Sequence, residues 1–215
     1  MKIILFGAPG SGKGTQASYI SERLGIPAVS TGNLIRDAIA SGHANGPAFK
    51  RFIDQGKLVP DEMVISLLAE RLSEKECSKG CILDGFPRTV NQAERLSAMG
   101  FVPDLVISLE VPDEVIEARA VGRRVCPICG LSYHLTDNKP IKEGVCDKCN
   151  VPLVIRKDDE PETVRKRLQV FHEQTADVKA FYEASGLVRK IDASSSVDNT
   201  QKQVRDILES YNDQH

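Results

Sequence analysis

The chain has 215 residues, a formal net charge of −2 and a charged fraction of 27%. This length can bury a substantial core, and the charge gives no net basic field for nucleic acid or an anionic membrane. No apolar stretch is long enough to cross a bilayer, and the run after Lys2 ends at Gly7, too early for a secretory signal. We therefore expect a cytoplasmic protein without nucleic-acid or membrane partners, whose six cysteines are reduced or metal-bound rather than paired.

The N-terminal segment predicts a strand, a glycine-rich loop and a helix. Apolar Ile3–Phe6 precedes residues 7–15, GAPGSGKGT, and a helix is expected over Lys13–Leu24. Glycines let backbone N–H groups turn inward, where the helix N-terminus and a lysine can face a polyphosphate. Gly14 stands where Ser or Thr usually follows the lysine of a phosphate loop. The alternative is a flexible turn that binds nothing, but the flanking strand and helix favour a nucleoside triphosphate site.

Apolar runs and helical patterns alternate through the rest of the chain. Strands are expected at Pro27–Ser30, Cys81–Asp84, Leu105–Val111 and Leu187–Asp192. Helices are expected at Asn33–Ser41, Asp61–Ser73, Thr89–Met99, Asp113–Val121, Pro161–Ala184 and Thr200–Tyr211. The alternation predicts an α/β fold, a parallel sheet with helices on both faces. Asp113 is expected as an N-cap, Pro161 in a first helical turn and Gly186 just past a helix end.

Residues 122–159 interrupt this alternation, because cysteines, prolines and glycines crowd them and no helical period is visible. Two C-x2-C pairs, Cys126 with Cys129 and Cys146 with Cys149, stand 16 residues apart, a spacing typical of a zinc ribbon. Four thiolates complete a tetrahedron around Zn²⁺ and leave no open position. We therefore interpret this segment as a small inserted domain with a structural metal.

Other interpretations of the cysteines stay open. Two disulfides are disfavoured by the expected cytosolic location, and four free thiols by the paired spacing. His134, five residues after Cys129, could replace one sulfur as a ligand. Cys77 and Cys81 are interpreted as ordinary core or surface thiols.

Several arginines stand where they could surround a phosphoryl group. Phosphoryl transfer needs alignment, a metal ion and positive charge rather than covalent help. Arg88 comes directly after the predicted strand Cys81–Asp84, and ligands bind at the carboxyl ends of parallel strands. Arg123 and Arg156 bracket the cysteine segment, and Arg167 lies on the next predicted helix. Any one of them could be a solvated surface side chain, but together they favour a phosphoryl-transfer site.

Over essentially its whole length the chain resembles the adenylate kinase family. Residues 7–16 match the family's phosphate loop, including the Gly14-Thr15 departure, and residues 30–36 match its nucleoside monophosphate segment, with Asn33 where Asp is common. Further signatures are matched by residues 56–61, residues 83–89 and Gln92. Residues 122–124 and 156–159 match the two edges of the long lid, which in this family often carries zinc on four cysteines.

The resemblance implies a P-loop NTPase-like parallel sheet flanked by helices, with two insertions. The expected core is formed by residues 1–29, 60–121 and 160–215, the NMP-binding segment by 30–59 and the zinc-ribbon lid by 122–159. The implied reaction is ATP + AMP ⇌ 2 ADP with Mg²⁺, in a monomer whose partners are these nucleotides.

The resemblance also implies roles for individual residues. ATP binding is expected of Gly10, Ser11, Gly12, Lys13, Gly14, Thr15, Arg119, Arg123, Ser132, Tyr133 and Ser195. AMP binding is expected of Thr31, Gly32, Arg36, Lys57, Leu58, Val59, Gly85, Phe86, Pro87, Arg88, Gln92, Arg156 and Arg167. The groups expected to neutralise the transferred phosphoryl group are Lys13, Arg88, Arg123, Arg156 and Arg167. Asp84 is expected to organise Mg²⁺ through water, and Phe86-Pro87 to be a cis bond.

Two rival functions remain at this point. Another nucleoside monophosphate kinase, acting on UMP, CMP or GMP, is disfavoured because Thr31 and Gln92 resemble the adenine-selecting pattern and the lid is long. A zinc-ribbon nucleic-acid binder would need a basic face with interleaved aromatic residues. The chain has no tryptophan, and Tyr133 is the single tyrosine of the ribbon.

Overall fold

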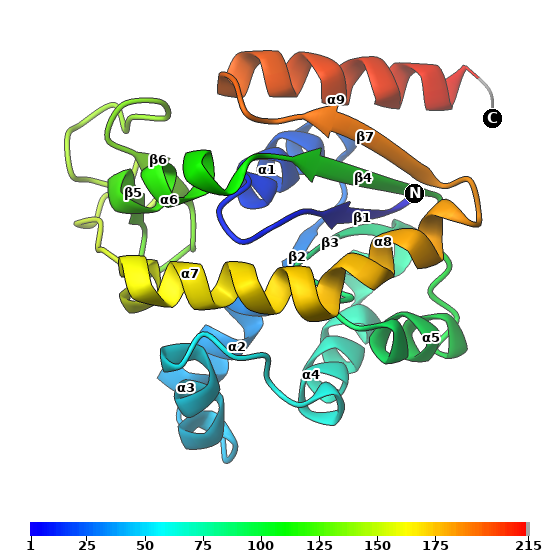
Figure 1. Cartoon of the computed structure of the whole chain (residues 1–215), viewed down its shortest axis with the longest axis horizontal. Coiled ribbons are helices and arrows are strands. Elements are labelled where there is room, and N and C mark those ends of the chain that lie inside the picture. The colour runs from blue at the N-terminus through cyan, green and yellow to red at the C-terminus, as the bar shows by residue number, and fades with distance from the viewer. Residues whose placement is uncertain (214–215) are drawn as a thin grey trace.

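The computed structural model describes residues 1–213 and has a five-stranded parallel sheet at its centre (Figure 1). The strands lie in the order β2-β3-β1-β4-β7 and each pairs in parallel with its neighbours. Their bounds are β1 (Lys2–Phe6), β2 (Ala28–Ser30), β3 (Cys81–Asp84), β4 (Leu105–Glu110) and β7 (Val188–Asp192). All of the strands predicted from the sequence are therefore confirmed, and their carboxyl ends share one edge of the sheet.

Alternate residues of the central strands β1, β3 and β4 pack against different helices, so both faces of the sheet are covered. Ile4 and Phe6 of β1 contribute to one apolar cluster. This cluster includes side chains from α2 (Thr31–Ala40), α3 (Gly46–Asp54), α4 (Asp61–Ser73), α5 (Val90–Ala98) and α8 (Ala176–Glu183). Ile3 and Leu5 belong to a second cluster, with side chains from α1 (Lys13–Leu24) and α9 (Val197–Asn212). Burial on both faces explains why the strands are continuous apolar runs in the sequence.

The predicted N-cap of α6 (Asp113–Gly122) and the predicted starts of α2 and α9 need correction. The N-cap of α6 is Pro112, and the Asp113 carboxylate instead lies 2.9 Å from Nε2 of His172. Helix α2 begins at Thr31 rather than Asn33. Helix α9 begins at Val197 because the hydroxyl of Ser196 accepts a hydrogen bond from the backbone N–H of Asn199.

The expected single helix over residues 161–184 consists of three parts. They are α7 (Pro161–Val170), a π-helical turn (Phe171–Thr175) and α8. Pro161 occupies the first turn of α7, and Gly186 follows α8 with φ 70°, as predicted. Helix α3 and the short 3-10 helix Lys75–Lys79 were not predicted from the sequence.

Residues 123–159 contain no α-helix, in agreement with the missing helical period. Strands β5 (Arg123–Val125) and β6 (Ser132–His134) form an antiparallel pair, and a 3-10 turn covers Lys157–Asp159. The buried centre of this segment consists of Cys126, Tyr133 and Cys146. So small a core calls for an additional source of stability.

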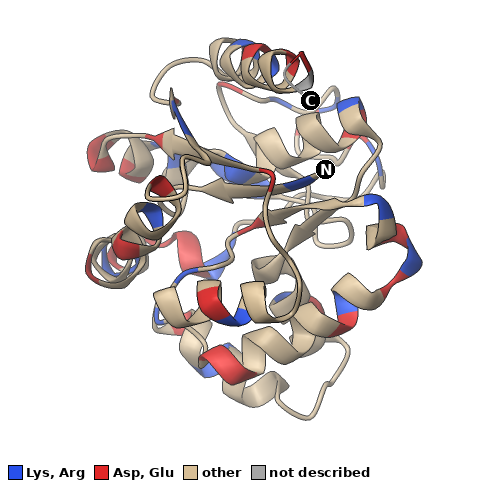
Figure 2. Ribbon diagram, turned by 90° about the vertical axis from the view of Figure 1, so that its right-hand side faces the viewer, with Lys and Arg blue, Asp and Glu red and all other residues tan. Residues whose placement is uncertain are grey.

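No helix within residues 1–213 is both long and apolar enough to pass through a lipid bilayer. On the side that Figure 2 shows, Lys and Arg residues are interspersed with Asp and Glu along the outer helices. This view therefore presents no face of a single charge.

Candidate active site

The phosphate loop connects β1 to α1 at the carboxyl edge of the sheet. Gly7, Gly10 and Gly12 all have positive φ values, of 146°, 91° and 97°. Gly12 is the N-cap of α1 and offers no side chain, so the first N–H groups of the helix are left for a ligand. The buried hydroxyl of Ser11 also has no hydrogen-bond partner among the described residues. The loop therefore presents unused donors, as an anion site requires.

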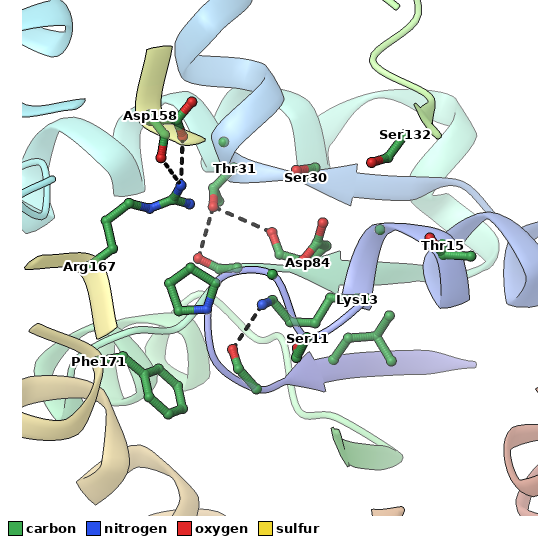
Figure 3. Close-up of a pocket in the computed structure, with 18 of the residues that line it drawn as sticks. Ser11, Lys13, Thr15, Ser30, Thr31, Asp84, Ser132, Asp158, Arg167 and Phe171 are labelled. Carbon is green, nitrogen blue, oxygen red and sulfur yellow. Dashed lines mark hydrogen bonds and ion pairs between the residues drawn. The ribbon is translucent and has the colours of Figure 1, made fainter. Parts of the chain in front are cut away.

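Lys13 lies against this loop, where its Nζ donates to the carbonyl oxygens of Gly7 and Ala8, each at 2.8 Å (Figure 3). Burial lowers the pKa of Lys13 to about 8, although Asp84 partly offsets this effect. Arg88 is among the cations that lower the pKa further. A phosphate in the loop would reverse these influences by giving the ammonium group an anionic partner.

The segment after β3 is shaped by hydrogen bonds to the carbonyl oxygen of Gly85. The hydroxyl of Thr31 donates to it at 2.9 Å (Figure 3), and Nε of Arg88 donates to it at 2.7 Å. The Phe86-Pro87 bond is cis, as predicted. The carboxylate of Asp84 lies beside the phosphate loop, where a Cβ built on Gly14 would be 3.8 Å from it.

The side chain of Gln92 is held by a network that the sequence analysis did not identify. Its Nε2 donates to Asp61 at 2.6 Å, and its Oε1 accepts from the backbone N–H of Arg88 at 2.7 Å. The same Asp61 carboxylate accepts from Thr89 and Asn91, at 3.0 and 2.7 Å. Asp61 therefore orients the start of α5 toward the cavity. The only sequence signal for it was its position at the end of the matched residues 56–61.

Two buried aspartates orient the arginines that follow the lid. Arg156 donates to Asp158 at 2.7 and 3.0 Å, and Arg167 lies 2.9 Å from the same carboxylate (Figure 3). Arg123 forms a two-point ion pair with Asp159, one hydrogen bond measuring 2.7 Å. Burial opposes ionisation of Asp158, but Arg167 and Arg156 outweigh it and hold its pKa well below the ordinary range.

Positive charge exceeds negative charge in this region. Burial lowers the pKa of Arg36 to about 10, and Arg156 lowers it further. Burial also lowers the pKa of Arg167 to about 9, against the opposing influence of Asp158. Arginine remains protonated at neutral pH. A bound anion would offset the cost of burying these cations together.

The lid and the segment of α2 meet at one edge of the cavity. A Cβ built on Gly130 would lie 2.6 Å from Nδ2 of Asn33, so the lid backbone is in close contact with α2 there. On another side, the guanidinium of Arg119 donates to the carbonyl oxygens of residues 193–195, at 2.8 to 3.0 Å. This places Arg119 beside Ser195, as the predicted ATP site requires.

One cavity brings together all of the nucleotide-site residues predicted from the sequence, from the phosphate loop to Ser195. Its lining also includes residues that the sequence analysis did not assign to the nucleotides, among them Asn33, His134, Asp158, Phe171 and Thr175. Phe171 and Thr175 belong to the π-helical turn, which no local pattern in the sequence had marked.

Comparison with the sequences of known proteins supports the interpretation of this cavity as a nucleotide site. A family model described as adenylate kinase matches residues 5–187. The adenylate kinase of Pelobacter propionicus is 48% identical over 213 residues, 97% of each chain. That of Caldicellulosiruptor bescii is 46% identical over 208 residues, 95% of this chain and 97% of the relative. The chain belongs to the adenylate kinase family.

Members of the adenylate kinase family act on ATP, AMP and ADP and use Mg²⁺ with ATP. The predicted activity, reversible phosphoryl transfer between ATP and AMP, is therefore confirmed, as is the P-loop NTPase-like fold. Another relative, from Syntrophotalea carbinolica, is 48% identical over 212 residues, covering 97% of this chain and 98% of its own.

The lid of this adenylate kinase family member brings its four cysteines together. The sulfur atoms of Cys126, Cys129, Cys146 and Cys149 all lie within 4.8 Å of one another, and those of Cys129 and Cys146 are 3.7 Å apart. Zn–S bonds of about 2.3 Å in a tetrahedron require S···S separations of about 3.8 Å, so the set fits zinc. All six cysteines of the chain are free thiols, which removes the disulfide alternative.

Each C-x2-C pair is followed by a residue in the left-handed region of the backbone. Gly130 and Asn150 both have positive φ, 71° and 55°. His134 is not part of the sulfur cluster, because its Nδ1 is hydrogen-bonded to Thr136 and its ring lies against Gly122. Cys77 and Cys81 are buried outside the lid, in agreement with a core position.

Proposed function

We propose that the cavity aligns ATP and AMP end to end. The phosphate loop and the lid would bind ATP, and residues 30–59 together with the loop after β3 would bind AMP. The proposal rests on one observation: buried cations whose charge is not fully balanced by nearby carboxylates line a single cavity. Between the two nucleotides, the transferred phosphoryl group would meet Lys13, Arg88, Arg123, Arg156 and Arg167.

These cations supply what the reaction needs. The transition state spreads charge over the phosphoryl oxygens, and positioned positive groups stabilise it. The AMP phosphate is already an anionic nucleophile, so no general base is required. Lys13 would exchange the carbonyls of Gly7 and Ala8 for phosphate oxygens. Closure of the lid and of residues 30–59 over the site excludes water, which would otherwise hydrolyse ATP.

Asp84 fits the role of organising Mg²⁺ through water. Its carboxylate lies at the carboxyl end of β3 beside the phosphate loop, and Mg²⁺ prefers oxygen ligands. When bound, the ion would neutralise charge on the ATP phosphates.

Gln92 supports selection of adenine over other bases. With Asp61 and the Arg88 N–H each taking one of its hydrogen bonds, its amide keeps one donor and one acceptor for a base edge. Because Asp61 fixes the orientation of this amide, we propose that Gln92 and Thr31 together favour AMP.

We further propose that the chain is organised as a core of residues 1–29, 60–121 and 160–215, an AMP segment of 30–59 and a lid of 122–159. The lid would hold a structural Zn²⁺ on its four cysteines. We expect a cytoplasmic monomer without nucleic-acid or membrane partners, with sedimentation and an RNA gel shift as direct tests.

The deciding experiment compares ADP formation in a coupled assay with AMP, UMP, CMP and GMP as acceptors. We expect AMP to give by far the highest kcat/KM. Comparable rates with another monophosphate would contradict the proposed role of Gln92. Metal analysis on the same preparation should find one zinc per chain, and its absence would contradict the proposed lid site.

A further inference from the structure

Tyr133 is the middle residue of β6 and stands between two residues of the cavity wall. All three residues of β6 line the cavity, and Ser132 and His134 pair with Val125 and Arg123 of β5. Side chains alternate along a strand, so the ring of Tyr133 turns away from these two. It is 7% exposed and packs in the cluster of Cys126 and Cys146.

The hydroxyl of Tyr133 makes two polar contacts inside the lid. The backbone N–H of Asp147 donates to the phenol oxygen at 3.0 Å. The sulfur of Cys146 lies 3.6 Å from the phenol oxygen, and because a metal-bound thiolate has no proton to give, the phenol is the donor to it once the metal is bound. The same sulfur accepts from the backbone N–H of Cys149 at 3.4 Å. A sulfur that accepts two hydrogen bonds is well suited to be a charged ligand of a metal ion.

We propose that Tyr133 is a positioning residue that joins the lid's metal site to its ATP site. Its hydroxyl donates to the Cys146 ligand, and its backbone carries Ser132 and His134 at the cavity. This inference rests on the proposed zinc site and goes beyond it, because it makes occupancy of that site a determinant of ATP affinity.

The dimensions of β6 explain why such a link is needed. The strand has three residues and pairs with one neighbour, β5, itself three residues long. So short a hairpin has little stability of its own. The contacts of Tyr133 with Cys146 and Asp147 connect it to the second cysteine pair. Loss of the hydroxyl would therefore loosen both the metal ligand and the cavity wall.

The test is Tyr133→Phe, which keeps the ring and its packing and removes only the hydroxyl. The matched control is Tyr182→Phe, a buried tyrosine of α8 in the main core. Zinc affinity is measured by chelator competition on the full chain, and KM is measured separately for ATP and AMP. We expect Tyr133→Phe to bind zinc about tenfold more weakly, as is common for lost outer hydrogen bonds to metal ligands. KM for ATP should rise while KM for AMP stays unchanged, and Tyr182→Phe should match the wild type in all three.

The outcomes separate the two proposals. Wild-type protein that takes up no zinc would overturn the metal site and the role of Tyr133 with it. If the wild type binds zinc and Tyr133→Phe binds it equally well, only the role of Tyr133 fails. Weaker zinc binding with an unchanged KM for ATP would overturn the link between the two sites.

Discussion

The phosphate loop and the lid both bring donors and positive charge to the same cavity, but they are held in place by different means. The loop follows β1, whose Ile3, Ile4 and Leu5 are at most 2% exposed between two layers of helices. The lid has only Cys126, Tyr133 and Cys146 at its buried centre. An apolar core can therefore fix one half of the site, whereas the other half needs a metal ion or an equivalent cross-link.

The strongest way to test this comparison is Lys13→Ala. The side chain lies in the rigid half, so its loss should remove a transition-state contact without disturbing the fold. We expect activity to fall on the order of 100-fold or more. Circular dichroism and the melting temperature should stay near those of the wild type. Lys166→Ala, which removes an exposed lysine paired with Glu162, is the control and should remain active. Near-normal turnover of Lys13→Ala would refute the assignment.

Arg88→Ala tests whether the loop after β3 acts on the transferred group. Because Arg88 donates to the carbonyl oxygen of Gly85 and is proposed to face AMP rather than the adenosine of ATP, kcat should drop by about 100-fold, with a smaller change in KM for ATP. Arg95→Ala removes an exposed arginine from α5, the helix that follows this loop, and should leave kcat unchanged. An Arg88→Ala enzyme with normal kcat and a raised KM for ATP would show that the role is wrong.

Cys146→Ser or Cys149→Ser tests the other half. Either should release zinc, lower the melting temperature by about 5 °C or more and loosen residues 122–159 in hydrogen exchange, while the phosphate loop stays protected. At low temperature and saturating ATP much of the activity should remain, because Arg123 and Arg156 are unchanged. Cys77→Ser, outside the lid, should keep its zinc. A stable, zinc-free and fully inactive Cys146→Ser protein would instead indicate a catalytic metal.

The smallest expected effect is a fractional uptake of protons when ATP binds. The pKa of Lys13 is about 8 in the free protein, below its unfolded value, so the unfolded chain binds more protons between pH 8 and 10.5. Stability of the free protein should therefore rise with pH in this window. ATP phosphates should raise the pKa of Lys13, so binding at pH 8.5 should take up a fraction of a proton and weaken as pH increases. Calorimetry in two buffers of different ionisation enthalpy measures this uptake, and Lys13→Arg should abolish it.

The elements that depend on short stretches of sequence could be predicted from the sequence alone. The phosphate loop and the strands depend on short-range patterns, namely glycines at fixed spacing and continuous apolar runs. Helix α3 was missed because it begins at Gly46-Pro47, which reads as a turn. The roles of Asp61, Asp158 and Tyr133 depend on contacts made only after folding. Asp61 and Gln92 are 31 positions apart in the sequence, and no local pattern predicts a hydrogen bond between them.

The contact of Gly130 with Asn33 affects how nucleotides enter and leave the cavity. Where lid and α2 touch, no substrate or product can pass, so each catalytic cycle that uses this side has to open and remake the contact. Asn33 is an uncharged amide and Gly130 has no side chain, so parting these two residues breaks no ion pair between them. The charged pairing of α2 with the lid segment lies elsewhere, between Arg36 and Asp158, and this contact adds nothing to it.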